Sequence, residues 1–377
     1  MKIEKVVLRK LKMDLKFPFQ TSFGTSEGRE FLITEVYGEN HIGYGECVVD
    51  TKPFYSEETV QTAWHMMKDF LIPFLFQKEE ILHPNEVRDI FRQVRRHNMA
   101  KSALEGAIWD LYAKEQGKPL AEVIGGEKKQ ISVGVSIGIQ KTKEDLVEIV
   151  GKYLEQGFQK IKIKIKPGKD IEMLQAVRDQ FGDIPLMADA NSAYTLDDIH
   201  LFKQMDPLHL MMFEQPLAHD DIIDHAKLQE AIKTPICLDE SIHSVEDARK
   251  AIELGSCKII NIKIGRVGGI AEAIKIHDLC KENQIPVWCG GMLESGIGRA
   301  HNLAITSLDN FTIPGDTAPS ARYWEEDIIQ PEIEMNENGE IELSAKPGLG
   351  YEINQGALER YTVSTETFLK SKLQAEK

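Results

Sequence analysis

The chain lacks three features by which whole classes of protein are recognised: paired cysteines, a long apolar run and an excess of basic residues. Its five cysteines are odd in number and none belongs to a CxxC pair, which disfavours a disulfide framework and a thiolate zinc site. No stretch approaches the roughly 18 consecutive apolar residues of a membrane span. The formal net charge of −15 disfavours nonspecific nucleic-acid binding, which requires a basic face, and mainly favours solubility. We therefore expect neither a nucleic-acid nor a membrane partner.

The start of the chain carries no targeting pattern. Residues 1–10 alternate between apolar and polar side chains like a β-strand and lack the continuous apolar core of a signal peptide. We therefore expect a cytoplasmic protein. With 377 residues, of which 42% are hydrophobic, the chain is long enough for a barrel of about 250 residues and a smaller second domain.

The first third of the chain shows strand patterns followed by helical ones. Residues 2–15 and 31–37 alternate, and the glycines within 41–47 indicate a hairpin. Apolar residues then recur at helical spacing over 56–77, 85–96 and 98–116. Strands before helices predict an α+β domain over residues 1–125.

From residue 126 to 324, short apolar strands alternate with amphipathic helices. The strands are expected near 131–138, 160–165, 185–189, 210–214, 235–239, 258–263, 286–291 and 311–313. This repeat predicts an α/β fold, a (β/α)7β TIM-like barrel, and a doubly wound open sheet is the competing architecture. Residues 325–377 contain a hairpin-like pair around 336–339 and no further βα unit. We expect this C-terminal tail to return to the first domain and to form, with it, an α+β cap over the barrel.

Five ionisable residues close successive strands at almost constant spacing. Lys164, Asp189, Glu214, Asp239 and Lys263 are separated by 25, 25, 25 and 24 residues, the length of one βα unit. The C-terminal ends of all barrel strands meet at one mouth, where barrel enzymes place their chemistry. An open sheet offers no reason for five such charges to converge. The spacing therefore favours the barrel and indicates a metal-assisted proton-transfer site.

The strand expected at 160–165 is unusual because lysines alternate with isoleucines along it. A solvated edge strand is the plain alternative, since lysines block edge pairing. Within a run of βα repeats, however, the isoleucines should pack on the helices while the lysines point into the barrel. Lys162 and Lys164 would then reach the mouth, with Lys160 below them and Lys166 beyond the strand.

Three carboxylates at adjacent strand ends should approach one point. Their mutual repulsion would be costly there, and a hard divalent cation removes it. Asp189, Glu214 and Asp239 offer only oxygen ligands, which suit Mg²⁺ better than Zn²⁺, and Mn²⁺ or another divalent cation can substitute. A single carboxylate at a strand end is often only a helix cap. We expect these three in register to bind the metal.

Two lysines should face each other across the mouth and place a base on each face of a bound substrate. A free lysine is a poor base at neutral pH, because its pKa is about 10.4. Burial and neighbouring positive charges improve it, and the sequence offers Lys162 beside Lys164 and Arg266 near Lys263. Arg266 fits equally well as a surface residue of its glycine-rich loop. Metal binding would further stabilise the enolate that forms when a proton next to a carboxylate is removed.

At these positions the chain resembles the enolase superfamily, whose sites use lysine or histidine bases with Mg²⁺, and in particular its muconate-lactonizing-enzyme subgroup. The matching motifs are Lys162-Ile-Lys164, Asp189-Ala-Asn191, Glu214-Gln-Pro216, Asp239-Glu-Ser241 and the segment 263–269. Within the subgroup, residues 290–298, Pro18-Phe19 and the segment 22–28 are similar to the o-succinylbenzoate synthase and N-acylamino-acid racemase family. The resemblance implies a capping α+β domain over a (β/α)7β barrel.

The resemblance implies two reactions that share their first step. In the synthase reaction, Lys164 removes the proton α to the carboxylate of 2-succinyl-6-hydroxy-2,4-cyclohexadiene-1-carboxylate and then protonates the departing hydroxyl, while Lys263 acts as a cation. In the racemase reaction, the two lysines work as a two-base pair on an N-succinylamino acid. We expect the synthase reaction, a step of menaquinone synthesis, with the racemase as the alternative or as a second activity.

Three other readings are disfavoured. Muconate cycloisomerase and dipeptide epimerase are more distant relatives, and an epimerase usually carries an Asp-x-Asp pair on the last strand, which Glu294-Ser295-Gly296 does not match. A non-catalytic barrel would have lost a lysine or a metal ligand, and none is lost here.

The substrate is expected to be a small carboxylate enclosed between the cap and the mouth, in a homo-oligomeric protein. Capping-loop aromatics would close over it, although the two phenylalanines would fit an ordinary domain interface equally well. The expected substrate-binding residues are Phe19, Phe23, Tyr55, Ser136, Asn191, Arg266, Ser295, Gly296 and Tyr323.

Overall fold

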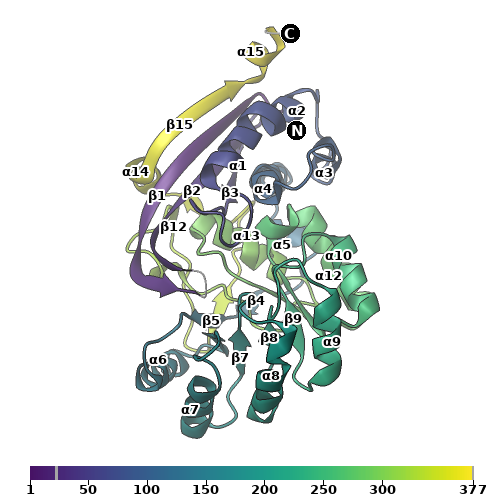
Figure 1. The fold of residues 1–377 in the computed structure, drawn as a ribbon. Coiled ribbons are helices and arrows are strands. Elements are labelled where there is room, and N and C mark those ends of the chain that lie inside the picture. Colours follow the sequence, from purple (N-terminus) through teal and green to yellow (C-terminus); the bar gives the residue numbers. More distant parts are fainter. Residues whose placement is uncertain (22–23, 376–377) are drawn as a thin grey trace.

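Two units make up the molecule, a cap built on an antiparallel sheet and a barrel of parallel strands (Figure 1). The computed structural model describes residues 1–21 and 24–375. The cap sheet has the order β15-β1-β2-β3, so the last strand of the chain pairs with the first. Its strands are β1 Lys5–Gln20, β2 Thr25–Tyr37, β3 Ile42–Cys47 and β15 Thr362–Leu369.

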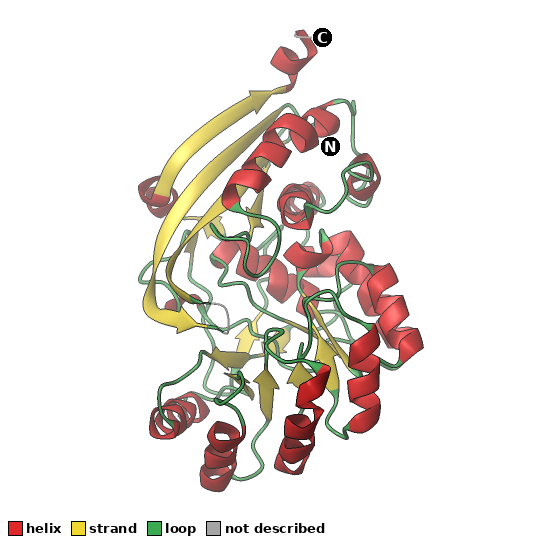
Figure 2. Cartoon of the chain, viewed as in Figure 1, coloured by secondary structure: helices red, strands yellow, loops and turns green. Residues whose placement is uncertain are grey.

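The helices of the cap lie beside its sheet (Figure 2). They are α1 Val60–Met66, a π-helical turn Met67–Leu71, α2 Ile72–Phe76, α3 Glu86–Ile90, α4 Asn98–Glu115 and α5 Leu120–Val123. Gly43 lets β3 approach α4 closely, since a Cβ there would lie 1.9 Å from the Ala107 carbonyl oxygen. The predicted helix over 85–96 is shorter than expected. Arg96 and His97 adopt left-handed conformations, with φ of 56° and 52°, which breaks the helical path before α4.

The barrel has seven named strands in one parallel sheet, which runs from β5 to β11 in chain order. They are β5 Gly134–Ile137, β6 Lys160–Lys164, β7 Leu186–Asp189, β8 Phe213–Glu214, β9 Ile236–Leu238, β10 Ile259–Ile262 and β11 Val287–Cys289. Phe311 bridges to Val287 and Gly315 bridges to Val133, so the segment 311–316 closes the barrel in the place of an eighth strand. The predicted barrel with an α+β cap is confirmed.

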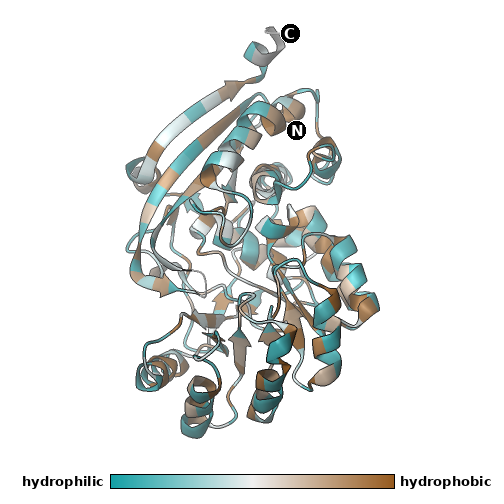
Figure 3. Ribbon diagram, in the orientation of Figure 1, coloured by the Kyte–Doolittle hydropathy of each residue, from teal (hydrophilic) through white to brown (hydrophobic). Residues whose placement is uncertain are grey.

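Amphipathic helices surround these strands (Figure 3). They are α6 Lys143–Glu155, α7 Ile171–Phe181, α8 Ile199–Met205, α9 Ile223–Ala231, α10 Val245–Leu254, the short α11 Ile264–Val267, α12 Ile270–Glu282 and α13 Gly296–Thr306, with 3-10 turns at Leu196–Asp198, Asp206–Leu208 and Ser320–Arg322. Thr142 and Ser244 accept hydrogen bonds from backbone N–H groups at the starts of α6 and α10. None of the described helices is both long and apolar enough to cross a membrane.

The C-terminal tail divides between the two units. Its elements are β12 Ile329–Gln330, β13 Glu340–Glu342, β14 Glu352–Ile353, α14 Gln355–Tyr361, β15 and α15 Lys370–Ala375. The turn at 336–339 leads into β13, but β13 pairs with β4 Gln130–Ser132 at the start of the barrel and not with the segment before the turn. This register places the buried Ile341 beside Ile131, which explains the choice of partner. The expected turn is present, since Asn336 N–H donates to the Glu340 carbonyl at 2.8 Å, but the strand that follows pairs with β4, and only the end of the tail joins the cap sheet.

Two buried glutamates of the cap complete helices of the barrel. Glu46 on β3 accepts hydrogen bonds from the Ser295 and Gly298 N–H groups at the start of α13. Glu105 on α4 accepts them from Ile270 and Ala271 N–H at the start of α12. Burial raises the pKa of each carboxyl to about 7. The cap thus supplies acceptors for helix N-termini that would otherwise lack them.

The end of β1 is fixed to the barrel mouth. The Gln20 carbonyl accepts a hydrogen bond from Ile139 N–H at 3.1 Å, just after β5. Gly138 makes this approach possible, because a Cβ there would lie 2.8 Å from the Gln20 oxygen. The end of β1 that carries Phe19 is therefore held over the ends of the barrel strands.

Candidate active site

Three carboxylates meet at the ends of β7, β8 and β9. Asp189 lies opposite Glu214 in the parallel ladder, and Lys164 lies opposite Asp189 on its other side. Asp239 follows β9 directly, and all three carboxylate residues have no exposed surface. The register of neighbouring parallel strands thus brings residues about 25 positions apart in the sequence to one place.

Two ammonium groups of β6 cover the first two carboxylates. Lys164 Nζ donates to Asp189 Oδ2 at 2.6 Å and to Asn191 Oδ1 at 2.6 Å. Lys162 Nζ lies 3.0 Å from Glu214 Oε2 and 3.1 Å from Asp189 Oδ2. The lysines of this strand therefore point into the barrel, and the edge-strand alternative does not apply.

Asp239 is covered by three donors. Lys263 Nζ donates to its Oδ2 at 2.7 Å and to the Tyr55 phenol oxygen at 3.0 Å, and the Tyr55 hydroxyl donates to Oδ1 at 3.1 Å. The Arg266 guanidinium also binds Oδ1. Arg266 is only 3% exposed, so it belongs to this buried group and is not a surface residue.

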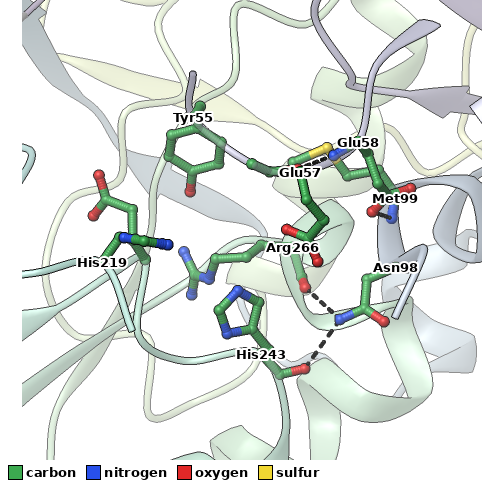
Figure 4. Close-up of a pocket in the computed structure, with 10 residues that line it drawn as sticks. Tyr55, Glu57, Glu58, Asn98, Met99, His219, His243 and Arg266 are labelled. Carbon is green, nitrogen blue, oxygen red and sulfur yellow. Dashed lines mark hydrogen bonds between the residues drawn. The ribbon is translucent and has the colours of Figure 1, made fainter. Parts of the chain in front are cut away.

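Asn98 of α4 fixes the loop that carries Arg266. Its Nδ2 donates to the Arg266 carbonyl at 2.8 Å and to the His243 carbonyl at 3.3 Å (Figure 4). The polar pocket around Asn98 and Arg266 has a volume of about 360 Å³. Tyr55 lines both this pocket and the larger cavity between the cap and the barrel mouth. Burial, with the charge of Arg266, lowers the pKa of His243 to about 4, which leaves this imidazole neutral near pH 7.

The charges around Lys263 do not make it a stronger base in this arrangement. Burial alone would lower the pKa of Lys263, but the negative charge of Asp239, together with Tyr55 and Glu240, raises it overall. Arg266 directs its own charge to Asp239, whose pKa is held low by Lys263 and Arg266 against the effect of burial. The expectation that Arg266 activates Lys263 by repulsion is therefore wrong here. A cation on Asp239 would remove the main cause of the raised pKa.

The three carboxylates suit a hard divalent cation by their chemistry, but their oxygens are hydrogen-bonded to lysine and arginine side chains. Within residues 1–21 and 24–375, no three acidic, histidine or cysteine side chains form a metal-binding group as they stand, because lysine and arginine side chains occupy the carboxylates. The three predicted ligands are buried and offer only oxygen. Burial and the charge of Asp189 also raise the pKa of Glu214, as expected for crowded acids. Asp189, Glu214 and Asp239 therefore offer the ligand chemistry that such a cation prefers.

A cavity of about 690 Å³ opens between the cap and the mouth. Lys164 and Lys263 both line it, and Asn191 lies beside Lys164. The cap contributes Phe19 and Tyr55 to its wall. The structure thus brings together the two lysines and three of the predicted substrate-binding residues.

Two predicted substrate-binding residues of the loop after β11 are turned away from this cavity. Ser295 donates its hydroxyl to Glu46 Oε2 at 2.6 Å, and Gly296 N–H donates to Asp327 Oδ1 at 2.8 Å. Both residues start α13, and their polar groups serve the helix terminus. Neither lines the cavity, so the expectation that they contact the substrate is not supported.

The remaining predicted substrate-binding residues are Tyr323, Ser136 and Phe23. Tyr323 is 6% exposed and packs beneath the guanidinium of Arg299, with centres 4.9 Å apart, so it is not a wall of the cavity. Ser136 lies on β5 opposite Lys162, where its buried hydroxyl has no hydrogen-bond partner among the described residues, and it does not line the cavity either. Phe23 lies outside the described residues.

Several residues of the site were missed by sequence reasoning. Asn261 Nδ2 donates to Glu214 Oε1 at 2.7 Å, and its place two residues before Lys263 on β10 was a usable signal. Glu240 accepts a hydrogen bond from Asn191 Nδ2 at 3.0 Å. Arg29 of the cap donates to four backbone carbonyls, which no sequence pattern could have indicated.

The segment that closes the barrel changes where the Asp-x-Asp pair of an epimerase should be sought. The test for an epimerase used Glu294-Ser295-Gly296, but these residues follow β11, the seventh strand of the sheet. The closing segment ends in Pro314-Gly315-Asp316, which contains one aspartate. The Asp-x-Asp pair is therefore still absent, for a different reason.

A capped (β/α)7β barrel with oxygen ligands and two lysines at its mouth defines an enzyme of the enolase superfamily. The chain belongs to the mandelate racemase/muconate lactonizing enzyme family. Residues 3–125 match the N-terminal domain of that family and residues 145–357 match the enolase C-terminal domain-like family.

Relatives of known name cover nearly the whole chain. The chain is 58% identical over 367 residues to the o-succinylbenzoate synthase of Geobacillus kaustophilus, with 97% of each chain covered. It is 45% identical to the N-succinylamino acid racemase of Thermus thermophilus, with 96% of this chain and 98% of that protein covered. A solved enolase-superfamily structure from Listeria innocua superimposes with a TM-score of 0.95 at 43% identity and covers 98% of this chain and 100% of its own.

Proposed function

We propose that the protein is an o-succinylbenzoate synthase, a carbon–oxygen lyase that dehydrates 2-succinyl-6-hydroxy-2,4-cyclohexadiene-1-carboxylate to 2-succinylbenzoate. The observation that carries the proposal is the pair of lysines, Lys164 and Lys263, which line one cavity beside three buried carboxylates. The choice of reaction is supported by relatives named o-succinylbenzoate synthase at 58%, 57% and 52% identity, each with 97% of this chain covered.

The proposed reaction begins and ends at Lys164. Its neutral Nζ takes the proton α to the carboxylate, and the electron pair of that C–H bond enters an enediolate. The C–O bond at the neighbouring carbon then breaks, and the proton on Lys164 leaves with the hydroxyl as water, on the same face of the ring. Asn191 and Asp189 hold Lys164 Nζ at 2.6 Å each, which fixes the base relative to the substrate.

Two other cations stabilise the negative charge in this proposal. Lys162 lies below Lys164 on the same face of β6, does not line the cavity, and would add positive charge behind the substrate carboxylate. Lys263, whose raised pKa keeps it protonated, would act as a cation on the opposite side of the intermediate.

We also propose Mg²⁺ as the cofactor, with Mn²⁺ or another divalent cation able to substitute. Asp189, Glu214 and Asp239 would hold it, and the bound cation would supply positive charge for the developing enediolate. A dipeptide epimerase of Cytophaga hutchinsonii, 26% identical to this chain, has been solved in complex with Mg and the dipeptide D-Ala-L-Val.

A second candidate is N-succinylamino-acid racemase activity in the same site. The exposure of both lysines to one cavity favours it, because a two-base racemase needs a base on each face of the α-carbon. The racemase relative at 45% identity supports it as well. In that reaction Lys263 must lose its proton, so metal binding at Asp239 would be a condition for it.

A paired assay tests both candidates. Purified protein with Mg²⁺ should convert the cyclohexadiene substrate to 2-succinylbenzoate, which is followed by absorbance. Solvent deuterium should enter the α-position of both N-succinylamino-acid enantiomers if the racemase activity is present. A protein with no turnover of the first substrate contradicts the synthase, and one that exchanges neither enantiomer contradicts the racemase.

The setting of the reaction is proposed with the activity. We propose a cytoplasmic homo-oligomer that acts on a small carboxylate. Light scattering coupled to size-exclusion chromatography tests the assembly, and a mass equal to one chain would contradict it.

A further inference from the structure

A buried carboxylate that does not belong to the proposed metal ligands lies beneath the mouth. Asp316 ends the segment that closes the barrel, and its side chain is 4% exposed. Its backbone N–H donates to the Cys289 carbonyl at 2.9 Å, and the preceding Gly315 carbonyl accepts from Gly134 N–H at 2.7 Å. The backbone at Asp316 is therefore held by the strands on both sides of the closure.

Asp316 joins two buried lysines of β6. Its Oδ2 lies 2.6 Å from Lys162 Nζ, and its Oδ1 lies 3.3 Å from Lys160 Nζ. Lys160 has no exposed surface, and its ammonium lies 3.5 Å from the centre of the Trp288 ring. Gly134 leaves room for its stem, since a Cβ there would lie 2.6 Å from Lys160 Cε. Burial of a lysine is costly unless it is paired, and Asp316 and Trp288 provide that pairing.

The reason for this arrangement lies in what surrounds Lys162. Its Nζ faces Asp316 at 2.6 Å, Glu214 at 3.0 Å and Asp189 at 3.1 Å. Glu214 and Asp189 are proposed metal ligands, and a cation bound to them would compete with Lys162 for their charge. Asp316 is not among those ligands. It is the partner that Lys162 would keep, an argument that rests on the proposed function.

We propose that Asp316, supported from below by Lys160, is a positioning residue that holds the Lys162 ammonium at the mouth in the metal-loaded enzyme. It acts on the reaction only through Lys162, which lies behind Lys164 and, in the proposed function, adds positive charge on the side where the enediolate forms. The enediolate carries more negative charge than the substrate, so misplacement of Lys162 lowers kcat more than it raises KM.

A double-mutant cycle tests this role. Asp316→Asn should lower kcat of the Mg²⁺-loaded enzyme about 10- to 100-fold, as for other residues that orient a group at a metal site. In a Lys162→Ala background the same substitution should change the remaining kcat by less than about threefold, because the residue through which it acts is gone. Equal losses in the two backgrounds, or no loss in the first, would overturn the proposal.

Metal affinity supplies a readout that does not depend on turnover. Calorimetric titration of the metal-free Asp316→Asn variant with Mg²⁺ should give an affinity within about threefold of the parent, because Asp316 is not a ligand. A loss greater than about 100-fold would make it a ligand and overturn the proposal. Asp110→Asn is the matched control: Asp110 is equally buried but binds Tyr44 N–H and Leu349 N–H, so kcat should not change.

Two outcomes need a separate interpretation: a variant that does not fold and a wild-type protein that has no activity. If Asp316→Asn does not fold, the same cycle is run with Lys160→Met, which keeps the length of the stem and removes the support below Asp316; it should show a smaller kcat loss that also vanishes without Lys162. An inactive wild type overturns the proposed function and the role of Asp316 together. An active wild type with equal losses in both backgrounds overturns the role of Asp316 alone.

Discussion

The barrel and the cap border the same cavity with different chemistry. The barrel wall presents buried charges in direct contact, such as Lys164 on Asp189 and Lys263 on Asp239. The cap presents the ring of Phe19 and the phenol of Tyr55, while its buried cation, Arg29, is bound to backbone carbonyls. The barrel side is therefore equipped to move a proton and stabilise charge, and the cap side to enclose and select the substrate.

The difference has an energetic meaning. A charge in the barrel wall interacts with several others at hydrogen-bond distance, so removing one changes the protonation of its neighbours as well. Arg29 of the cap interacts with backbone carbonyls, so removing it should change the shape of the cavity and leave the charges of the barrel wall in place. Substitutions in the two regions should therefore separate kcat effects from KM effects.

The largest expected effect is on the barrel side, at the proposed base. Lys164→Ala should lower kcat by about a thousandfold or more, because it removes general base catalysis together with a group held in position. Lys166→Ala is the matched control on the same lysine-rich segment, since Lys166 lies beyond β6 and does not line the cavity. Steady-state kinetics of both variants, with circular dichroism to show that they fold, would refute the assignment if Lys164→Ala stayed within tenfold of the parent.

The metal ligands come next. Glu214→Gln should weaken Mg²⁺ binding by more than the about 100-fold typical of residues that only orient ligands, because a carboxylate ligand is lost. Glu294→Gln provides the control, since Glu294 is also buried, in the loop after β11, but accepts hydrogen bonds from Met292 N–H and Asn302. Calorimetric titration after chelation measures both affinities. Equal affinities in the two variants would remove Glu214 from the ligand set.

On the cap side, Arg29 should affect KM before kcat. Arg29 donates to the carbonyls of Val48 and Val49 in the cap and to those of Met292 and Leu293 in the barrel, so it holds the two walls of the cavity together. Arg29→Met should raise KM about tenfold with a smaller change in kcat, in line with a loss of about 1 to 3 kcal/mol for buried groups left unpaired.

The control for Arg29 is Arg9→Met in the same sheet. Arg9 pairs with Glu35 and does not line the cavity, so KM should stay at the value of the parent. Should Arg29→Met instead lower kcat with KM unchanged, the division of labour between the two walls would be incorrect.

The smallest expected effect concerns pH and the contact between cap and barrel. Burial raises the pKa of Glu46 from 4.5 to about 7, so the folded protein retains a proton that the unfolded chain has already released. The stability from this proton is fully present below pH 4.5 and is lost as the pH rises through about 7. The melting temperature should therefore fall by a few degrees, about 2 to 4 °C per kcal/mol, between weakly acidic and weakly alkaline buffer.

Glu46→Gln tests this dependence, because the amide cannot ionise. Its melting temperature should change less over the same pH range than that of the parent. The exposed Glu39→Gln, in the turn between β2 and β3, should behave like the parent. Identical pH profiles for Glu46→Gln and the parent would show that Glu46 does not carry the effect.

Much of the barrel side could be predicted from the sequence, because strand register converts spacing directly into proximity. The 25-residue interval placed Asp189 beside Glu214, and the alternation along β6 placed Lys162 and Lys164 inside the barrel. Asp316 was missed for a physical reason. It lies on an irregular segment that has no strand pattern, and its partner Lys162 is more than 150 positions away in the sequence.

The cap side and the helix starts were less predictable. Ser295 was expected at the substrate because it follows a barrel strand, but the buried Glu46, 249 positions away, takes its hydroxyl. Which partner a hydroxyl finds is decided by packing between distant segments, and local patterns carry no signal of it. For the same reason the position of Phe19, at the end of β1, and of Tyr55, on the loop after β3, in the cavity wall was indicated by motif position and not by any contact that could be foreseen.

The two cap glutamates that accept hydrogen bonds from the starts of barrel helices determine how such a chain can be divided or recombined. Glu46 and Glu105 complete the starts of α13 and α12 from a different part of the chain, so a barrel expressed alone would expose four N–H groups without acceptors. Exchange of whole caps between relatives would succeed only where both acids arrive in register. New specificities should therefore be easier to obtain by grafting the short segments around residues 19 and 55 than by exchanging complete caps. The same restriction applies to natural recombination between relatives.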